Sequence, residues 1–410
     1  MTYPDIVRET ALGGRVVLWE ESARDGAQGK TLMSADFRVE LARTQGAMFG
    51  ADGPRHVVFA AGFPAVCREE FEATRRVALE AGDRVSPAAV CRATPEDVLQ
   101  ACRCVAGARN ARVMIVVPAS DEIADAMVHG TAAEALREAV GLVRLVVESG
   151  MDVVPDVCFA DAPRGDVALM AVAATELTAV GAGLIVIADT TGDMLHTRAG
   201  ALFGELRARA GADVVFVTHL HNDLGLGLVN TLEAVRAGVR GVSSSWLGVA
   251  ERSGMVATEQ LLFLLAYRAD ELLGAGVELW YTAPDLTRLP VIARMVAAET
   301  GLPITVTTPI VGTGVGTIST GTPFVRPATF QPFDPKAVLG IEPTVLLTHL
   351  ASGRVLRAVA SRLGYELSKQ EAFAALAWVK SEAFRRNHPV IPDEVFTDYL
   401  NTLRESAAVA

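Results

Sequence analysis

Two histidines placed two residues apart, His219 and His221, are the side chains best suited to chemistry in this sequence. They lie in the segment HLHNDLG, directly after the apolar run 214–217, which reads as a buried β-strand. Residues two apart on a strand point to one face, roughly 6.5–7 Å from each other, so both imidazoles can face one ion. Histidine is the commonest metal ligand in proteins. The pair therefore indicates a metal site; two polar residues at a solvated strand end are the alternative interpretation.

A second polar segment lies far upstream and could supply a carboxylate to the same site. Residues 20–28, EESARDGAQ, follow the short apolar run 16–19 and place four charged side chains within six positions. Charged side chains crowded beside a strand that reads as buried are more typical of a functional site than of a hydrophobic core. A solvated charged loop is the alternative, and this segment alone does not decide between the two.

The composition of the 410-residue chain is that of an ordinary globular protein, with 50% apolar and 21% charged residues. This length allows one large core with an appendage, or two or three domains. The net charge of −11 argues against nucleic acid as a partner, because binding phosphate backbones requires clustered Lys and Arg. The five cysteines are scattered without C-x-x-C spacing and read as reduced core residues.

The sequence shows no sign of a membrane segment. No apolar run approaches the ~20 residues of a membrane-spanning helix. The N-terminal residues MTYPD lack the basic and apolar regions of a secretion signal. We therefore expect a cytoplasmic protein without a membrane partner.

Short apolar, β-rich runs recur along the first 250 residues with helical stretches between them, at intervals of about 25 to 40 residues. Continuous apolar runs of this kind are typical of buried parallel strands in β–α units. The runs are 16–19, 57–60, 88–91, 113–117, 152–157, 184–188, 214–218 and 241–246. Eight runs favour an α/β fold that closes into a (β/α)8 TIM barrel over an open doubly wound sheet.

In such a barrel, chemistry gathers at the rim where strands end and loops begin. Asp25 follows the first run, His219 and His221 close the seventh, and Glu251 and Arg252 follow the eighth. All of them are therefore expected on one rim.

The character of the sequence changes after about residue 275, which divides the chain into three parts. Residues 1–275 are expected to form the catalytic barrel. Residues 276–343, rich in Pro, Gly and Thr, are expected to form a linker or subdomain. Residues 344–410 are expected to form a mainly helical C-terminal subdomain, with helices near 344–363, 369–386 and 392–404.

Three motifs occur in the same order as in a known superfamily: RDGAQ at 24–28, HLHNDLG at 219–225 and ERSG at 251–254. Together they resemble the metal-dependent acyltransferases and lyases (DRE-TIM metallolyases), which include 2-isopropylmalate synthase, homocitrate synthase, citramalate synthase and hydroxymethylglutaryl-CoA lyase. The resemblance implies a divalent cation, Mn²⁺, Mg²⁺ or Zn²⁺, held by Asp25, His219 and His221.

The same resemblance implies residues for the substrates, acetyl-CoA and an α-keto acid. Arg24 and Gln28 match positions that face the keto acid. Arg164, in DAPR at 161–164, and Thr190, in DTTG at 189–192, are candidates to hold substrate carboxylates. The implied reaction is a Claisen condensation, in which the cation polarises the keto group and Arg24 supports the developing alkoxide. Hydrolysis of the resulting thioester by water then makes the step irreversible and gives a 2-substituted malate and free CoA.

Two departures from the family pattern leave the catalytic base open. Met255 stands where the family has an asparagine ligand, and a thioether is a poor ligand for a hard ion. Residues 318–323 lack the family's His-x-x-Gly-x-His motif. Glu251 and His349 are the remaining candidates for the base or for a group that orients it. A solvated helix histidine is the alternative interpretation of His349.

Two features favour the 2-isopropylmalate and homocitrate synthase branch over the lyase branch. The loop after the eighth run, residues 245–250, has no cysteine, whereas the lyases carry one there. The chain also continues for more than a hundred residues beyond the barrel, as synthases do. No leucine-sensing regulatory domain is evident.

Arginines near the expected site suit an anionic keto acid, such as phosphonopyruvate, oxaloacetate or α-ketoglutarate. The motif pattern most resembles synthases that act on dianionic keto acids, including 2-phosphonomethylmalate synthase in phosphonate biosynthesis. The family resemblance implies a homodimer. A metal-dependent hydroxyacyl-CoA lyase or aldolase, and a non-catalytic barrel, are the alternative functions.

Overall fold

The structure is a computed structural model that describes residues 4–29 and 31–409. Contacts divide the chain into two compact units, Met1–Pro303 and Ile304–Ala410. This division falls later than the one expected after residue 275. Helix α14 (Leu289–Thr300) belongs to the first unit, because it packs against helices α3 and α12 of the barrel.

The first unit is a closed barrel of eight parallel strands in sequence order, in which β8 pairs back to β1. The strands are β1 (Val17–Glu20), β2 (Val57–Gly62), β3 (Ser86–Arg92), β4 (Arg112–Pro118), β5 (Val154–Ala160), β6 (Ile185–Asp189), β7 (Phe216–Leu220) and β8 (Gly241–Ser244). Each of the eight apolar runs forms one strand, so the predicted TIM barrel is confirmed.

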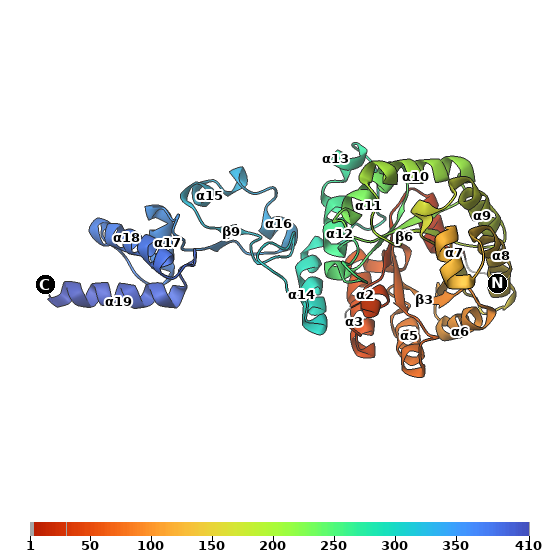
Figure 1. The fold of residues 1–410 in the computed structure, drawn as a ribbon. Coiled ribbons are helices and arrows are strands. Elements are labelled where there is room, and N and C mark those ends of the chain that lie inside the picture. The colour runs from red at the N-terminus through yellow and green to blue at the C-terminus, as the bar shows by residue number, and fades with distance from the viewer. Residues whose placement is uncertain (1–3, 30, 410) are drawn as a thin grey trace. The chain divides into compact units, whose positions relative to one another are not determined.

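A helix follows each strand and lies outside the ring of strands (Figure 1). These helices are α3 (Ala35–Gly46), α5 (Arg68–Ala81), α6 (Pro95–Val105), α8 (Ala132–Glu148), α9 (Val167–Ala179), α10 (His196–Ala210), α11 (Gly227–Arg236) and α12 (Thr258–Tyr267). The shorter helices of this unit are α1 (Ile6–Leu12), α2 (Asp25–Gly29), α4 (Gly53–His56), α7 (Asp121–Val128) and α13 (Ala269–Leu273). None of the helices in the described part of the chain combines the length and apolar character that crossing a membrane requires.

Helix α8 illustrates how the sequence sets these elements. The Thr131 hydroxyl accepts a hydrogen bond from the Glu134 N–H, and the Glu134 carboxylate accepts one from the Thr131 N–H, which together form a capping box. Leu136, Ala139 and Val143 recur at helical spacing on the buried face. The helix ends at Glu148, two residues before Gly150, and glycine is common just after helix ends.

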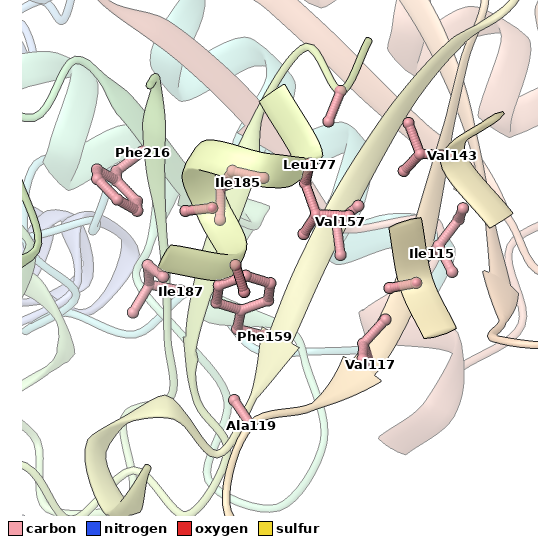
Figure 2. Close-up of a cluster of buried hydrophobic side chains, with 14 of the residues drawn as sticks. Ile115, Val117, Ala119, Val143, Val157, Phe159, Leu177, Ile185, Ile187 and Phe216 are labelled. Carbon is pink, nitrogen blue, oxygen red and sulfur yellow. The ribbon is translucent and has the colours of Figure 1, made fainter. Parts of the chain in front are cut away.

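Strand side chains alternate between the barrel interior and the surrounding helices. One buried cluster joins residues from β1 to β7, including Trp19 and Val217, and therefore fills the interior. The alternate side chains pack outward against the helices. Figure 2 shows this outer layer, with Phe159 of β5 and Ile187 of β6 in the same cluster as Leu177 of α9.

The second unit has a small core of its own. Its elements are the parallel pair β9 (Thr317–Ile318) and β10 (Thr344–Val345), with helices α15 (Gly321–Val325), α16 (Pro335–Leu339), α17 (Gly353–Arg362), α18 (Lys369–Arg385) and α19 (Asp393–Val409). Buried residues of α17, α18 and α19, such as Leu356, Val379 and Phe396, form the core.

The prediction of a helix near 344–363 is wrong for the first half of that range. Residues 347–349 are not helical, because they pair with 389–391 through hydrogen bonds from Ile391 N to Leu347 O (2.8 Å) and from His349 N to Pro389 O (3.2 Å). The helix begins only at Gly353, where the Ser352 hydroxyl caps it by accepting a hydrogen bond from Val355 N.

A buried ion network ties helix α1 to the strands of the barrel. The Arg112 guanidinium on β4, which is 1% exposed, donates two hydrogen bonds to Asp156 on β5 (2.7 and 2.8 Å). It donates a third to Asp5, which precedes α1 (2.6 Å). Asp156 also accepts the Leu184 N–H beside β6 (2.9 Å). The network therefore holds α1 and three adjacent strands together.

We predict that Arg112→Met destabilises the protein by about 3–5 kcal/mol, because it leaves a buried carboxylate without its cation. Urea unfolding measures the loss. The double variant Arg112→Met/Asp156→Asn is the control and is expected to recover much of the stability, since Asp5, which is partly exposed, is then the one charge of the network that remains. A loss below about 1 kcal/mol for Arg112→Met alone would contradict this account.

Candidate metal centre and active site

The structure brings Asp25, His219 and His221 into one buried cluster at the end of the barrel. Asp25 opens α2 just after β1, His219 lies in β7, and His221 follows that strand. Asp25 Oδ2 lies 3.3 Å from His219 Nε2 and 3.8 Å from His221 Nε2. The histidines have the same strand parity as Val215 and Val217 of the interior cluster. Alternation along β7 therefore points both imidazoles into the barrel.

This donor set fits a divalent cation. One atom from each side chain lies within 4.8 Å of the others. Bonds of about 2.1 Å at right angles separate neighbouring ligand atoms by about 3 Å, so small movements would place all three around one ion. A carboxylate and two imidazoles suit ions such as Mn²⁺ and Zn²⁺. Asp25, His219 and His221 would hold the cation and leave further positions for substrate or water.

The electrostatics of the cluster match this role. Burial opposes the charge of Asp25, but the His219 hydrogen bond and the Arg24 charge hold its pKa well below the ordinary range. Burial and the neighbouring His219 lower the pKa of His221 to about 4. Asp25 and Glu21 overcome burial and raise the pKa of His219 to about 9. In the metal-free cluster His219 is therefore protonated on both ring nitrogens at neutral pH, and a bound cation has to displace one of these protons.

The loop after β1 is shaped so that Asp25 faces the histidines. The Glu21 carbonyl accepts hydrogen bonds from the N–H groups of Arg24 (3.0 Å) and Asp25 (2.8 Å), which starts α2. A Cβ on Gly29 would lie 2.5 Å from the carbonyl oxygen of Ala250, so only glycine permits this close packing against the loop after β8. Across this contact, the Glu251 N–H donates to Asp25 Oδ1 (3.1 Å).

Arg24 lies at the edge of the cluster, and its side chain is 11% exposed. Its guanidinium donates to Asp25 Oδ2 at 2.8 Å, and its Nε lies 3.7 Å from Glu21 Oε2. Guanidinium groups bind carboxylates and phosphonates with two parallel hydrogen bonds. Arg24 is therefore placed to meet an anion that approaches the cluster.

Three other predicted residues lie in one hydrogen-bonded network on the rim. Thr190 Oγ1 accepts the Asp161 N–H (2.8 Å), and Arg164 donates to the Asp161 carboxylate (2.8 and 2.9 Å). The network continues through Arg252, which donates to the Thr190 carbonyl (2.7 Å) and lies 3.3 Å from Glu251. Thr190, Arg164 and Glu251 therefore share the rim, although Arg164 already has a carboxylate partner.

Gln28 and His349 lie apart from these contacts. Gln28 is exposed on α2, one turn after Asp25. His349 belongs to the second unit, where its ring packs edge-on against Phe384 at 5.9 Å and its buried Nδ1 has no hydrogen-bond partner among the described residues. It lies before α17 rather than in a helix, so the helix-histidine interpretation is wrong. A catalytic role for His349 stays a prediction.

Met255 is buried beside the cluster. Its backbone bridges to that of His221, and its side chain is 1% exposed. A buried thioether packs well in an apolar setting and adds no hard ligand. Among the described residues, Asp25, His219 and His221 are therefore the side chains of this cluster that could hold a cation.

Sequence reasoning assigned no role to Glu21, although its carboxylate oxygen Oε1 lies 3.4 Å from His219 Nδ1. Ser243 Oγ lies 3.3 Å from the same nitrogen. Strand parity contained a signal for Glu21, because Val17, Trp19 and Glu21 are successive alternate residues and the first two belong to the interior cluster.

A buried glutamate, Glu259, accepts a hydrogen bond from the loop after β8. Glu259 Oε2, at the start of α12, accepts the N–H of Leu247 (3.0 Å), whose backbone is in the left-handed region with φ 56°. Glu259 Oε1 has no hydrogen-bond partner within the described ranges. Burial raises the pKa of Glu259 to about 7. This loop leads to Glu251 and Arg252.

Comparison with known proteins decides the family. Residues 15–296, which include the whole barrel, match the profile of the HMGL-like family. The chain belongs to the HMGL-like family.

Known family relatives extend the match beyond the barrel. A 2-isopropylmalate synthase from Caulobacter sp. (strain K31) is 30% identical over 390 residues, which cover 93% of this chain and 71% of the relative. One from Nitrobacter winogradskyi is 29% identical and covers 91% of this chain and 70% of the relative. The structure of hydroxymethylglutaryl-CoA lyase from Pseudomonas aeruginosa has the same fold, with TM-score 0.56 and 18% identity over 71% of this chain and 94% of that chain.

We predict that the wild-type protein binds one Mn²⁺ per chain in equilibrium dialysis. Asp25→Ala and His219→Ala are expected to weaken this binding by more than about 100-fold, because loss of a supporting residue alone costs about 10–100-fold. Asp223→Asn is the matched control, since this carboxylate pairs with Arg252 and lies outside the cluster. Equal Mn²⁺ affinity in all four proteins would show that the cluster is no metal site.

We predict a pH-dependent stability difference between wild type and Glu259→Gln. The pKa of Glu259 returns to its ordinary value of 4.5 on unfolding, so between 4.5 and about 7 only the folded state holds the proton. Folding therefore loses stability as pH rises through this window.

From pH 6 to pH 8 the free energy of unfolding of the wild type is expected to fall by about 1 kcal/mol relative to that of Glu259→Gln, which has no titrating group at position 259. Urea unfolding of both proteins at the two pH values measures this change. A difference that stays constant, or that changes in the opposite direction, would contradict the assignment.

Proposed function

We propose that this protein is an acyltransferase that condenses acetyl-CoA with an α-keto acid in a metal-dependent Claisen reaction. Water then hydrolyses the thioester that the condensation forms, which gives a 2-substituted malate and free CoA. The observation that supports this most strongly is the buried Asp25, His219 and His221 cluster with Arg24 at its edge. It occurs in a chain whose likeness to 2-isopropylmalate synthases extends over 93% of its length.

The residues of the cluster have separate roles in binding the cation, binding the substrate and stabilising charge. A divalent cation held by Asp25, His219 and His221 would act as a Lewis acid on the keto group. Arg24 binds the oxygens of the keto acid and supports the negative charge that develops on the keto oxygen. The buried position of these groups keeps competing water away and strengthens their electrostatic effect.

Glu251 is our candidate for the base that removes a proton from the acetyl methyl group. Its backbone N–H is bonded to Asp25, while its side chain is 49% exposed on the rim, where a substrate can reach it. The backbone of Glu251 therefore lies beside the cluster, and its carboxylate lies on the rim next to Arg252. His349 is the second candidate for this role.

The keto acid we propose is dianionic, such as phosphonopyruvate, oxaloacetate or α-ketoglutarate. Arg24, Arg164 and Arg252 give the rim three guanidinium groups. Arg164 and Arg252 are paired with Asp161 and Asp223, so the substrate has to use their remaining N–H groups or displace a carboxylate. Arg24 is the arginine whose guanidinium contacts a cluster ligand directly.

Synthase chemistry is favoured over lyase chemistry by the extent of the sequence likeness. The likeness to 2-isopropylmalate synthases covers 93% of this chain and so reaches into the second unit, whereas the lyase structure covers 71% of it. A second unit shared with synthases is expected if it contributes to a reaction that the lyases do not carry out.

We predict release of free CoA, detected with a thiol reagent, only when acetyl-CoA, a keto acid and a divalent cation are all present. The assay uses phosphonopyruvate, oxaloacetate, α-ketoglutarate, α-ketoisovalerate and pyruvate, each with Mn²⁺, Mg²⁺ or Zn²⁺. Asp25→Ala is the inactive control. The dianionic acids are expected to give the highest kcat/KM.

Two outcomes would contradict this proposal. No CoA release with any keto acid would remove the synthase assignment. Keto acid formation from a hydroxyacyl-CoA, without condensation, would replace it with a lyase.

A further inference from the structure

We propose that Glu21 is the positioning residue of the metal centre: it holds His219 in the tautomer that can bind the cation, and it orients Arg24. This inference rests on the proposed function only for the part that concerns Arg24 and the keto acid. The part that concerns His219 rests on the geometry of the cluster alone.

Glu21 is a buried carboxylate without an ordinary hydrogen bond. It is 0% exposed, and neither of its carboxylate oxygens has a hydrogen-bond partner among the described residues. Its charged neighbours are His219, with Nδ1 3.4 Å from Oε1, and Arg24, with Nε 3.7 Å from Oε2. Burying a carboxylate is costly unless it is paired, so these two contacts are the ones that account for its charge.

The contact with His219 determines which ring nitrogen faces the cation. His219 Nε2 points to Asp25 at 3.3 Å, so Nε2 is the nitrogen available to bind an ion and Nδ1 has to carry the hydrogen. A carboxylate that accepts this hydrogen fixes the tautomer and the ring orientation, and it makes the imidazole a stronger ligand. Glu21 is placed to be that acceptor.

The two histidines differ in this respect. His221 Nδ1 is buried and has no hydrogen-bond partner in the described part of the chain. His219 Nδ1 forms a hydrogen bond with Ser243 Oγ at 3.3 Å, and Glu21 Oε1 lies 3.4 Å from the same nitrogen as an ion-pair contact and competing acceptor. A carboxylate is the stronger acceptor because it is charged. His219 is therefore the fixed ligand of the pair, and Glu21 is the group that fixes it.

The contact with Arg24 serves the substrate side of the site. Arg24 lies between two carboxylates, with Nη1 on Asp25 and Nε towards Glu21. When Asp25 binds the cation, Glu21 is the carboxylate that remains to orient the Arg24 guanidinium. The N–H groups of Arg24 that do not contact Asp25 or Glu21 are then available to an anion.

Glu20 provides a matched control next to Glu21 in the chain. It is also 0% exposed, but its Oε1 accepts hydrogen bonds from both the N–H and the hydroxyl of Ser22. It has the opposite strand parity, and its side-chain hydrogen bonds in the described part of the chain go to Ser22 and not to Asp25, His219 or His221. A change at Glu20 therefore tests the effect of losing a buried carboxylate at the end of β1 without disturbing His219.

The experiment measures Mn²⁺ affinity of the full chain by EPR of free Mn²⁺, without substrates, for wild type, Glu21→Gln and Glu20→Gln. Glu21→Gln keeps the shape and removes the charge, and it is expected to weaken Mn²⁺ binding by about 10–100-fold. Glu20→Gln is expected to stay within about threefold of wild type. Thermal unfolding in EDTA shows whether each variant is folded.

Two further variants keep the test decisive. Glu21→Asp retains the charge on a shorter side chain and is expected to lose affinity to a smaller extent than Glu21→Gln. Ser243→Ala tests the competing acceptor and is expected to lose less than Glu21→Gln. If Glu21→Gln does not fold, unchanged Mn²⁺ affinity in folded Glu21→Asp would overturn the proposal.

The inference is also overturned if Glu21→Gln binds Mn²⁺ as tightly as wild type, or if Ser243→Ala causes the larger loss. Its failure is distinguishable from failure of the proposed function. CoA release by wild type together with unchanged Mn²⁺ affinity in Glu21→Gln would leave the synthase proposal standing. A Mn²⁺ loss in a protein that releases no CoA would leave the role of Glu21 standing.

Discussion

The closure of the barrel is the constraint on which the rest of the site depends. Because β8 pairs with β1, the ends of β1, β7 and β8 meet at one rim, and residues about 200 positions apart in the chain come within hydrogen-bond distance. Alternation along β7 then points His219 and His221 inward, above the apolar side chains that fill the interior. The site therefore inherits its geometry from the backbone of the barrel.

The cost of burying charge shapes the chemistry of this rim. Asp25 and Glu21 bring two carboxylates into a buried space that also holds Arg24 and two imidazoles. Each charge has to be balanced by a neighbour or by a bound ion. A divalent cation would satisfy the carboxylate and both imidazoles together, which is why we regard the cluster as a metal centre rather than a structural ion pair.

The sequence predicted the parts of the molecule that follow from periodicity. Eight apolar runs became eight strands, and the spacing of His219 and His221 placed both on one face. It did not reveal that residues 347–349 are not helical, because pairing with 389–391 overrides the local helical pattern. It also missed the contact of Glu21 with His219 and the pairing of Arg164 with Asp161, since both depend on side-chain positions that spacing alone does not fix.

The central claim is that one cation is shared by Asp25, His219 and His221. Anomalous diffraction at the manganese edge, from crystals of the full chain grown with Mn²⁺, tests it most directly. We expect a strong peak about 2.2 Å from one Asp25 carboxylate oxygen and from the Nε2 atoms of both histidines. An ordered Mn²⁺ bound elsewhere, with no peak between these three side chains, would contradict it.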